Sequence, residues 1–472
     1  MKNNKINKVL SSVSYTMIAN IISLVISLIT ILILPRFMGI NQYAYWQLYL
    51  FYCSYVVFIS VGWCDGVYLR YGGYKYKDLP KDKFVTQFWT MIAYLCCVTI
   101  IMVIFIYNCD LIYDKKIVFY ATFLYGVVYI CRVYFEYILQ ATNRIKTYAK
   151  IILIDRISFL FMILILVTFK VANFKFLILT DLIIKFITLL YAIYKCRRIV
   201  FGKFVSLKIN IKETYDNISV GIKLTFANLA GILIVGIVRS AIENAWSVEM
   251  FGKISLTLSL NNMILVCVNA IGVVIFPILC RTSKEHLPKI YNTLKVIITV
   301  LLFGGIAIYY PIKNILLLWL PQYGDSLKYM ALLFPMCVFE SKMSLIINPY
   351  LKALRKENKL LYINLITVAL SIIVTFINVN ILKNINLTIL SITFLIIFRT
   401  GLAEILLMKT LKIKGSKQIV LDILMAIIFI NVSWNINSLA SVIIYIIIYV
   451  IYLILNISNI KRALIDVKTL IK

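Results

Sequence analysis

The first long apolar stretch of the chain is VLSSVSYTMIANIISLVISLITILIL, residues 9–34, and it contains no charged side chain. As an α-helix, about 20 such residues cross the hydrocarbon core of a bilayer, which is roughly 30 Å thick. The sequence PRFMGINQYAYW follows directly, at residues 35–46. Pro35 and Gly39 are typical of a helix end, and clustered tyrosine and tryptophan are typical of a membrane–water interface. This stretch therefore predicts a transmembrane helix that ends at the interface.

The rest of the chain has the same character. It has 472 residues, of which 62% are hydrophobic and 14% charged, and its mean hydropathy is +0.94. A water-soluble domain of this length cannot bury so much apolar side chain, because its surface must be largely polar. We therefore predict an all-α polytopic membrane protein.

Polar connections divide the chain into about 14 apolar segments, each long enough to approach a membrane span. The predicted spans are residues 11–34, 43–63, 84–107, 117–139, 148–169, 172–193, 217–238, 254–279, 290–310, 328–348, 360–381, 387–408, 419–434 and 438–456.

The formal net charge of +30 has an ordinary explanation in such a chain. Cytoplasmic loops of membrane proteins collect lysine and arginine, and most of these residues fall in every second connection. This pattern predicts that both termini are cytoplasmic and that nucleic acid is not a partner. The single histidine, His286, and the scattered cysteines have no metal-ligand spacing, so no metal site is expected.

Short internal matches indicate a repeat. Leu139-Gln140-Ala141 aligns with Leu351-Lys352-Ala353, and Ala19-Asn20 aligns with Ala227-Asn228 at a similar offset. Each match links one span to the sixth span after it, which predicts two six-helix lobes as parallel repeats. The expected organisation is an N-terminal lobe at residues 1–194, a basic cytoplasmic linker at 195–216, a C-terminal lobe at 217–408, and two extra spans with a cytoplasmic tail at 409–472.

Three motifs carry a family resemblance: LPRFMG with QYAYW (residues 34–39 and 42–46), LQATNRIKTYAK (139–150) and LKALRKENK (351–359). Through them, and through its length and span count, the chain resembles the Wzx-type flippases for lipid-linked oligosaccharides. These belong to the multidrug/oligosaccharidyl-lipid/polysaccharide exporter superfamily. One departure is Ala44, where the family usually has glycine.

The resemblance implies a carrier without a cofactor, not an enzyme, in the bacterial cytoplasmic (inner) membrane. Such a carrier moves undecaprenyl-pyrophosphate-linked oligosaccharide units to the outer leaflet by alternating access, for O-antigen or capsule synthesis. Membrane lipids surround it, and a polysaccharide polymerase or other assembly proteins are its possible partners.

Charged and amide side chains within or beside spans are costly, so each is a candidate functional residue. A guanidinium binds phosphate oxygens through two parallel hydrogen bonds, and amides can bind sugar hydroxyls. The candidates for the substrate pathway are Arg36, Arg132, Arg156, Lys223, Arg239, Asn261 and Asn262. For Arg36, snorkelling to the interface is an equally simple explanation; Asn261 and Asn262 could instead bridge helices.

The carboxylates Glu136, Asp155 and Asp181 are candidates for coupling transport to an ion. Structural roles are open for each. Asp181 and Lys185 are four residues apart and can pair on one helix face, as can Arg132 and Glu136. Asp155 and Arg156 are adjacent and point to different faces, so we expect at least one of them to find a partner on another helix or to face water.

Other functions remain alternatives. A lipid II flippase shares the fourteen-span plan, whereas a multidrug/ion antiporter of the same superfamily is expected to have twelve spans. A membrane glycan polymerase normally needs large outer loops, and the predicted outer loops here are short. No G-x-x-x-x-G-K-[ST] motif occurs, which argues against direct use of ATP.

Overall fold

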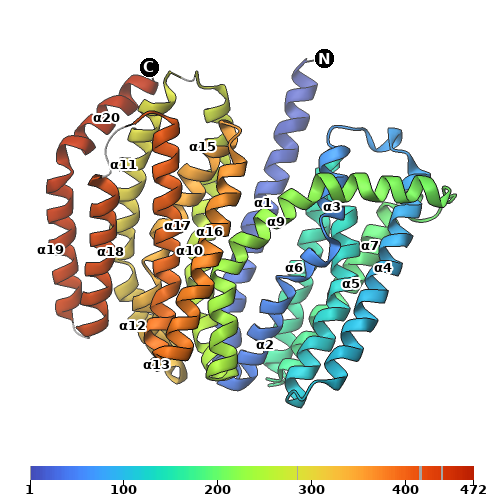
Figure 1. The fold of residues 1–472 in the computed structure, drawn as a ribbon, viewed down its shortest axis with the longest axis horizontal. Coiled ribbons are helices and arrows are strands. Elements are labelled where there is room, and N and C mark those ends of the chain that lie inside the picture. Colours follow the sequence, from blue (N-terminus) through green and yellow to red (C-terminus); the bar gives the residue numbers. More distant parts are fainter. Residues whose placement is uncertain (1, 284, 414–416, 437–438, 472) are drawn as a thin grey trace. The chain divides into compact units, whose positions relative to one another are not determined.

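The computed structural model describes residues 2–283, 285–413, 417–436 and 439–471. Every regular element in these ranges is helical (Figure 1). Contacts between Cα atoms divide the chain into two compact units, Met1–Leu229 and Ala230–Lys472, called here unit 1 and unit 2. The all-α fold predicted from the sequence is confirmed.

Unit 1 contains seven long helices or parts of them, joined by short turns. Its elements are α1 (Lys2–Phe37), α2 (Ile40–Cys53), η1 (Val56–Ser60), α3 (Trp63–Arg70), η2 (Tyr76–Asp78), α4 (Lys81–Asn108), α5 (Tyr113–Ala141), α6 (Ile145–Thr168), α7 (Phe174–Lys195), α8 (Arg197–Val200) and the first part of α9 (Leu207–Ala245). Helix α5 contacts α2, α3, α4, α6 and α7, so it lies at the centre of this unit.

Unit 2 contains the rest of α9 and the remaining helices. These are α10 (Val248–Arg281), α11 (Leu287–Ile306), α12 (Tyr309–Trp319), η3 (Pro321–Tyr323), α13 (Gly324–Leu333), α14 (Met336–Lys342), η4 (Met343–Ile347), α15 (Asn348–Ala353), α16 (Glu357–Phe376), η5 (Ile377–Ile381), α17 (Ile385–Thr410), α18 (Lys417–Asn435), α19 (Leu439–Leu455) and α20 (Ile457–Ile471). The segments η4 and η5 are single π-helical turns within longer helices.

The predicted spans largely coincide with helices, although short breaks interrupt the spans at 43–63 and 290–310, and the first residue of the span at 438–456 lies outside the described ranges. In the described part of the chain, ten helices are long and apolar enough to cross a membrane, or up to 13 if each of three bent pairs is one span. One bent pair, Pro321–Leu333 and Met336–Ala353, turns by 46°. Pro335 lies at this break, where it cannot donate a backbone hydrogen bond and so favours the bend.

The two aligned motifs adopt the same turn. After α5, Asn143 has a positive φ of 57°, and the Arg144 amide donates to the Leu139 carbonyl at 2.8 Å. After α15, Arg355 has a φ of 53°, and the Lys356 amide donates to the Leu351 carbonyl at 2.8 Å. A left-handed residue followed by such a bond satisfies carbonyls that the helix end leaves unpaired. The two motifs therefore resemble each other in backbone conformation as well as in sequence.

Helix α9 extends beyond the predicted seventh span. It has 39 residues, which correspond to ~58 Å of helix, far more than the roughly 30 Å hydrocarbon core requires. Residues 207–216, expected in a linker, are its first turns and lie crosswise at the ends of α3 and α4 (Figure 1). The boundary between unit 1 and unit 2 also lies inside this helix, after Leu229.

Candidate functional site

Three helices of unit 1 bring five charged side chains together in its interior. Helix α5 contributes Arg132 and Glu136, α6 contributes Asp155, and α7 contributes Asp181 and Lys185. Their exposed fractions lie between 4% and 9%. We call these five residues the α5–α7 charge cluster. Charges so deeply buried must be paired, because an isolated ion in an apolar interior is very costly.

Asp155 is the centre of the cluster. Lys185 Nζ lies 2.7 Å from its Oδ1 and 2.8 Å from its Oδ2, and Arg132 Nη1 lies 3.1 Å from Oδ2. One carboxylate thus bridges cations from α5 and α7. Of the two adjacent residues Asp155 and Arg156, Asp155 is therefore the one with partners on other helices, and Arg156 is exposed.

Glu136 and Asp181 lie at the edges. Glu136 Oε1 is 3.1 Å from Arg132 Nε, one helical turn away. Asp181 Oδ1 is 3.5 Å from Lys185 Nζ, and the hydroxyl of Tyr49 on α2 donates to Asp181 Oδ2 at 2.9 Å. The Asp181–Lys185 pair is therefore present, but Lys185 is closer to Asp155 than to Asp181.

The sum of formal charges indicates what the cluster can do chemically. With every group ionised, three carboxylates face two cations, which leaves one negative charge in the interior. Binding one proton would neutralise it and remove an electrostatic cost. Among the described residues, no group of three or more His, Cys, Asp or Glu side chains could hold a metal ion.

Unit 2 contains a second buried network, drawn from α11, α14, α17 and α18. Lys342 Nζ lies 2.8 Å from Glu404 Oε2 and 2.7 Å from Asp422 Oδ2, and Lys295 Nζ lies 2.6 Å from Glu404 Oε1. Two cations here balance two carboxylates. Lys295 and Asp422 both lie within predicted spans, so the criterion of charge within a span identifies them from the sequence as well.

A separate pair lies nearby in sequence. Arg399 Nη1 is 3.2 Å from Glu340 Oε1, and its Nε donates to Asn364 Oδ1 at 2.9 Å. This pair joins α14, α16 and α17 within unit 2.

The structure places the other predicted candidates elsewhere. Four of them are exposed: Arg36, Arg156, Lys223 and Asn262. Arg36 also lines a cavity of about 350 Å³ between the end of α1, the end of α6 and the start of α7. Two further candidates have structural contacts in unit 2. Arg239 Nη2 donates to Ser255 Oγ at 2.8 Å, and buried Asn261 donates to the Leu333 carbonyl at 3.1 Å.

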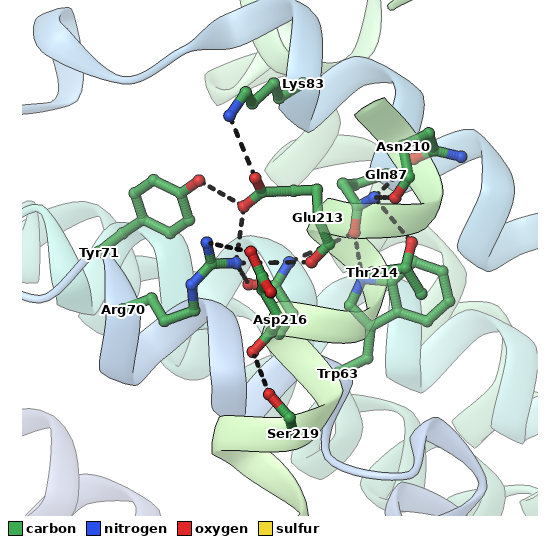
Figure 2. Close-up of polar contacts among 11 residues, drawn as sticks. Trp63, Arg70, Tyr71, Lys83, Gln87, Asn210, Glu213, Thr214, Asp216 and Ser219 are labelled. Carbon is green, nitrogen blue, oxygen red and sulfur yellow. Dashed lines mark hydrogen bonds and ion pairs between the residues drawn. The ribbon is translucent and has the colours of Figure 1, made fainter. Parts of the chain in front are cut away.

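Sequence reasoning also missed a polar cluster at the start of α9, shown in Figure 2. Glu213 Oε1 lies 2.7 Å from Arg70 Nη1 and accepts a hydrogen bond from the Tyr71 hydroxyl at 2.6 Å. Lys83 Nζ lies 3.2 Å from Glu213 Oε2. Burial, together with the hydrogen bond to the Glu213 carboxylate, raises the pKa of the Tyr71 phenol above its usual value, so it remains a donor.

An amide network continues this cluster between α3, α4 and α9. Trp63 Nε1 donates to Gln87 Oε1 at 2.7 Å, and Gln87 Nε2 donates to Thr214 Oγ1 at 2.9 Å (Figure 2). We call the residues of these two networks the α9 base: Trp63, Arg70, Tyr71, Lys83, Gln87, Glu213 and Thr214. The sequence did not predict the α9 base, because Glu213 lies in the stretch 195–216, which was expected to be a charged linker.

Two glycines allow α3 and α9 to approach closely. A Cβ atom on Gly66 would overlap the backbone oxygen of Asn217, and one on Gly221 would overlap the backbone oxygen of Gly62. The Thr225 hydroxyl donates to Asp65 Oδ2 at 2.7 Å beside this contact. Small residues at helix contacts in membranes permit such close backbone packing.

No protein-family model matches the sequence, and no curated protein matches it either. Solved structures with the same fold exist. A structure described as "Lipid II flippase MurJ, inward closed conformation" superposes with a TM-score of 0.64 and 12% identity, over 95% of this chain and 99% of that one. An inward-facing multidrug resistance MATE family transporter of the MOP superfamily superposes with a TM-score of 0.59 and 12% identity, over 89% of this chain and 100% of that one. At this identity the likeness concerns the fold.

Proposed function

We propose that this chain is a carrier that moves a lipid-linked oligosaccharide from one leaflet of the bacterial cytoplasmic membrane to the other. The full-length fold match carries the proposal, since 95% of the chain superposes on a structure described as a lipid II flippase. The sequence motifs quoted above support an oligosaccharide as the substrate. We infer a carrier rather than an enzyme, with both termini in the cytoplasm.

The substrate would move by alternating access. Its pyrophosphate is an anion, and a membrane potential that is negative inside favours outward movement by about 2.3 kcal/mol per charge at 100 mV. The membrane potential therefore favours export of the anionic substrate, and this contribution does not require ATP.

The α5–α7 charge cluster could couple transport to the binding of an ion. Its one excess carboxylate can accept a proton, and the protonated cluster has no net charge. Because Asp155 joins α5, α6 and α7 through its partners, loading the cluster would change the packing of these three helices. We propose that this coupling biases unit 1 between two states during transport.

Deleting the gene in its host tests the substrate. We expect single lipid-linked glycan units to accumulate on the cytoplasmic leaflet, measured by their accessibility to a membrane-impermeant glycan-modifying enzyme in sealed vesicles of both orientations. The intact chain should restore export. Arg132→Lys should restore it partly and Arg132→Ala should not, whereas Lys77→Gln in an exposed loop should match the intact chain.

The rival functions give different results. Single units stranded on the outer leaflet would indicate a polymerase. Trapped lipid II would identify a lipid II flippase. Greater sensitivity to drugs without any trapped glycan would favour a multidrug transporter, the function named for the second fold match. Comparable membrane levels of each variant, measured by immunoblot, are required for these comparisons.

A further inference from the structure

Unit 2 contains a polar pocket separate from its buried charge network. It has a volume of about 440 Å³ and is lined by residues of α12, α13, α18 and α19. These helix segments meet at the end of unit 2 that lies opposite the C-terminus (Figure 1). Volumes of roughly 300–1,000 Å³ are usual for small-molecule sites, so the pocket can hold a group the size of one sugar or one lipid head group.

The pocket is positively charged. Lys313 of α12 and Lys328 of α13 both line it, and none of the described lining residues is Asp or Glu. Lys313 Nζ lies 5.8 Å from the centroid of the Tyr309 ring. Lys328 Nζ is 3.6 Å from Asp325 Oδ1, but both side chains are mostly exposed, and such a pair contributes little. Two lysines at one pocket favour an anionic ligand.

The wall of the same pocket also contains several hydroxyl and amide groups. The Tyr309 side chain is fully buried and lines the pocket, yet its hydroxyl has no hydrogen-bond partner among the described residues. Buried hydroxyl groups nearly always have a partner. Beside it, the Tyr310 hydroxyl and Ser433 Oγ are 3.0 Å apart, and Asn314 adds an amide to the lining.

We propose that this pocket binds a phosphate carried on a polyol, such as the head group of an anionic glycerophospholipid or a sugar phosphate. The lysines would hold the phosphate, and the hydroxyl and amide groups of Tyr310, Ser433 and Asn314 would bind the polyol hydroxyls. Leu317, Ile436 and Val442 supply apolar lining. Because the pocket lies at the ends of membrane helices, it is at the depth where head groups lie.

The proposal does not depend on transport, because binding is measured without it. The purified full-length chain in detergent would be titrated with phosphatidylglycerol, and bound lipid counted by native mass spectrometry. Phosphatidylcholine with the same acyl chains is the lipid control. We expect at least tenfold tighter binding of phosphatidylglycerol, and loss of this preference in the Lys313→Gln/Lys328→Gln variant.

A matched variant controls for net charge. Lys115→Gln/Lys116→Gln removes two lysines from the start of α5, in unit 1, and should retain the lipid preference. Ser433→Ala removes only one lining hydroxyl and should weaken binding about threefold. Equal melting temperatures without added lipid would show that each variant is folded.

Glucose 6-phosphate distinguishes the two sources of ligand. If it displaces phosphatidylglycerol from the intact chain at millimolar concentration, the site accepts a sugar phosphate; if it does not, the ligand is a membrane lipid. Either result supports the site when the lysine dependence holds. Equal binding by the intact chain and the Lys313→Gln/Lys328→Gln variant, or equal losses in both double-lysine variants, would overturn the proposal.

Discussion

At the scale of single residues, Asp155 illustrates how this chain places charge in an apolar interior. Its neighbour in sequence, Arg156, is exposed. Lys185 of α7 contacts both oxygens of the Asp155 carboxylate, and Arg132 of α5 contacts Oδ2. A carboxylate that bridges two helices in this way is costly to leave unpaired. Substitution of one member should therefore affect the whole α5–α7 charge cluster.

Arg132→Gln tests this dependence. It removes a cation from two carboxylates, so we expect a loss of about 3 kcal/mol in unfolding free energy, as for other broken buried pairs. Adding Glu136→Gln removes one excess negative charge and should restore part of the stability. Thermal unfolding in detergent measures both effects. Arg156→Gln is the matched control, and a similar loss there would mean that net charge, not pairing, is responsible.

Gly66→Ala tests the close packing of α3 against α9. The new methyl group would overlap the Asn217 backbone oxygen, which cannot move without displacing the helix. Overpacking of this kind costs about 1–3 kcal/mol, so the melting temperature should fall by several degrees. Gly401→Ala has no neighbouring atom within 4 Å and should be neutral or slightly stabilising, because alanine favours a helix. Equal melting temperatures for the two variants would contradict the packing argument.

At the scale of elements, α9 differs most from its sequence-based expectation. Residues 207–216 are charged enough to resemble a loop, and they form a helix whose polar side chains contact α3 and α4. The α9 base thus anchors the first turns of a helix that continues past the division between the two units.

Glu213→Gln should loosen the α9 base. The substitution removes the carboxylate that faces Arg70 and Lys83, and a hydrogen bond to a charged group contributes about 1.5–3 kcal/mol. Amide hydrogen exchange of residues 207–217 should therefore become about tenfold faster. Asp216→Asn is the control, since Asp216 is 39% exposed and lies 3.5 Å from Arg70. Unchanged exchange in the Glu213→Gln variant would show that packing alone holds these turns.

At the scale of the whole molecule, charge in the connections predicts orientation. Lysine- and arginine-rich loops remain in the cytoplasm. A protease-cleavable tag placed at either terminus should therefore be protected from added protease in sealed right-side-out vesicles. A tag inserted between α4 and α5 should be cleaved, because this connection is predicted to lie outside. Cleavage at the termini and protection of the inserted tag would reverse the predicted topology.

The two units also differ in electrostatics at this scale. The buried network of unit 2 balances two cations with two carboxylates, whereas the α5–α7 charge cluster has one carboxylate in excess. Ion coupling is therefore proposed for unit 1, and the network of unit 2 is explained by helix packing. Asp422 belongs to α18, so this network ties one of the two extra C-terminal helices to the rest of unit 2.

The sequence by itself determined the all-α membrane fold, the approximate positions of its apolar helices and the match between the segments that precede the turns at Asn143 and Arg355. These features depend on local physics, namely the length of apolar runs and the geometry of helix ends. Only the tertiary structure decided that Asp155 pairs with Lys185 and Arg132, that Glu213 anchors α9, and that Lys313 and Lys328 share a pocket. These partners come from different helices, and spacing along the chain does not specify which faces of packed helices meet.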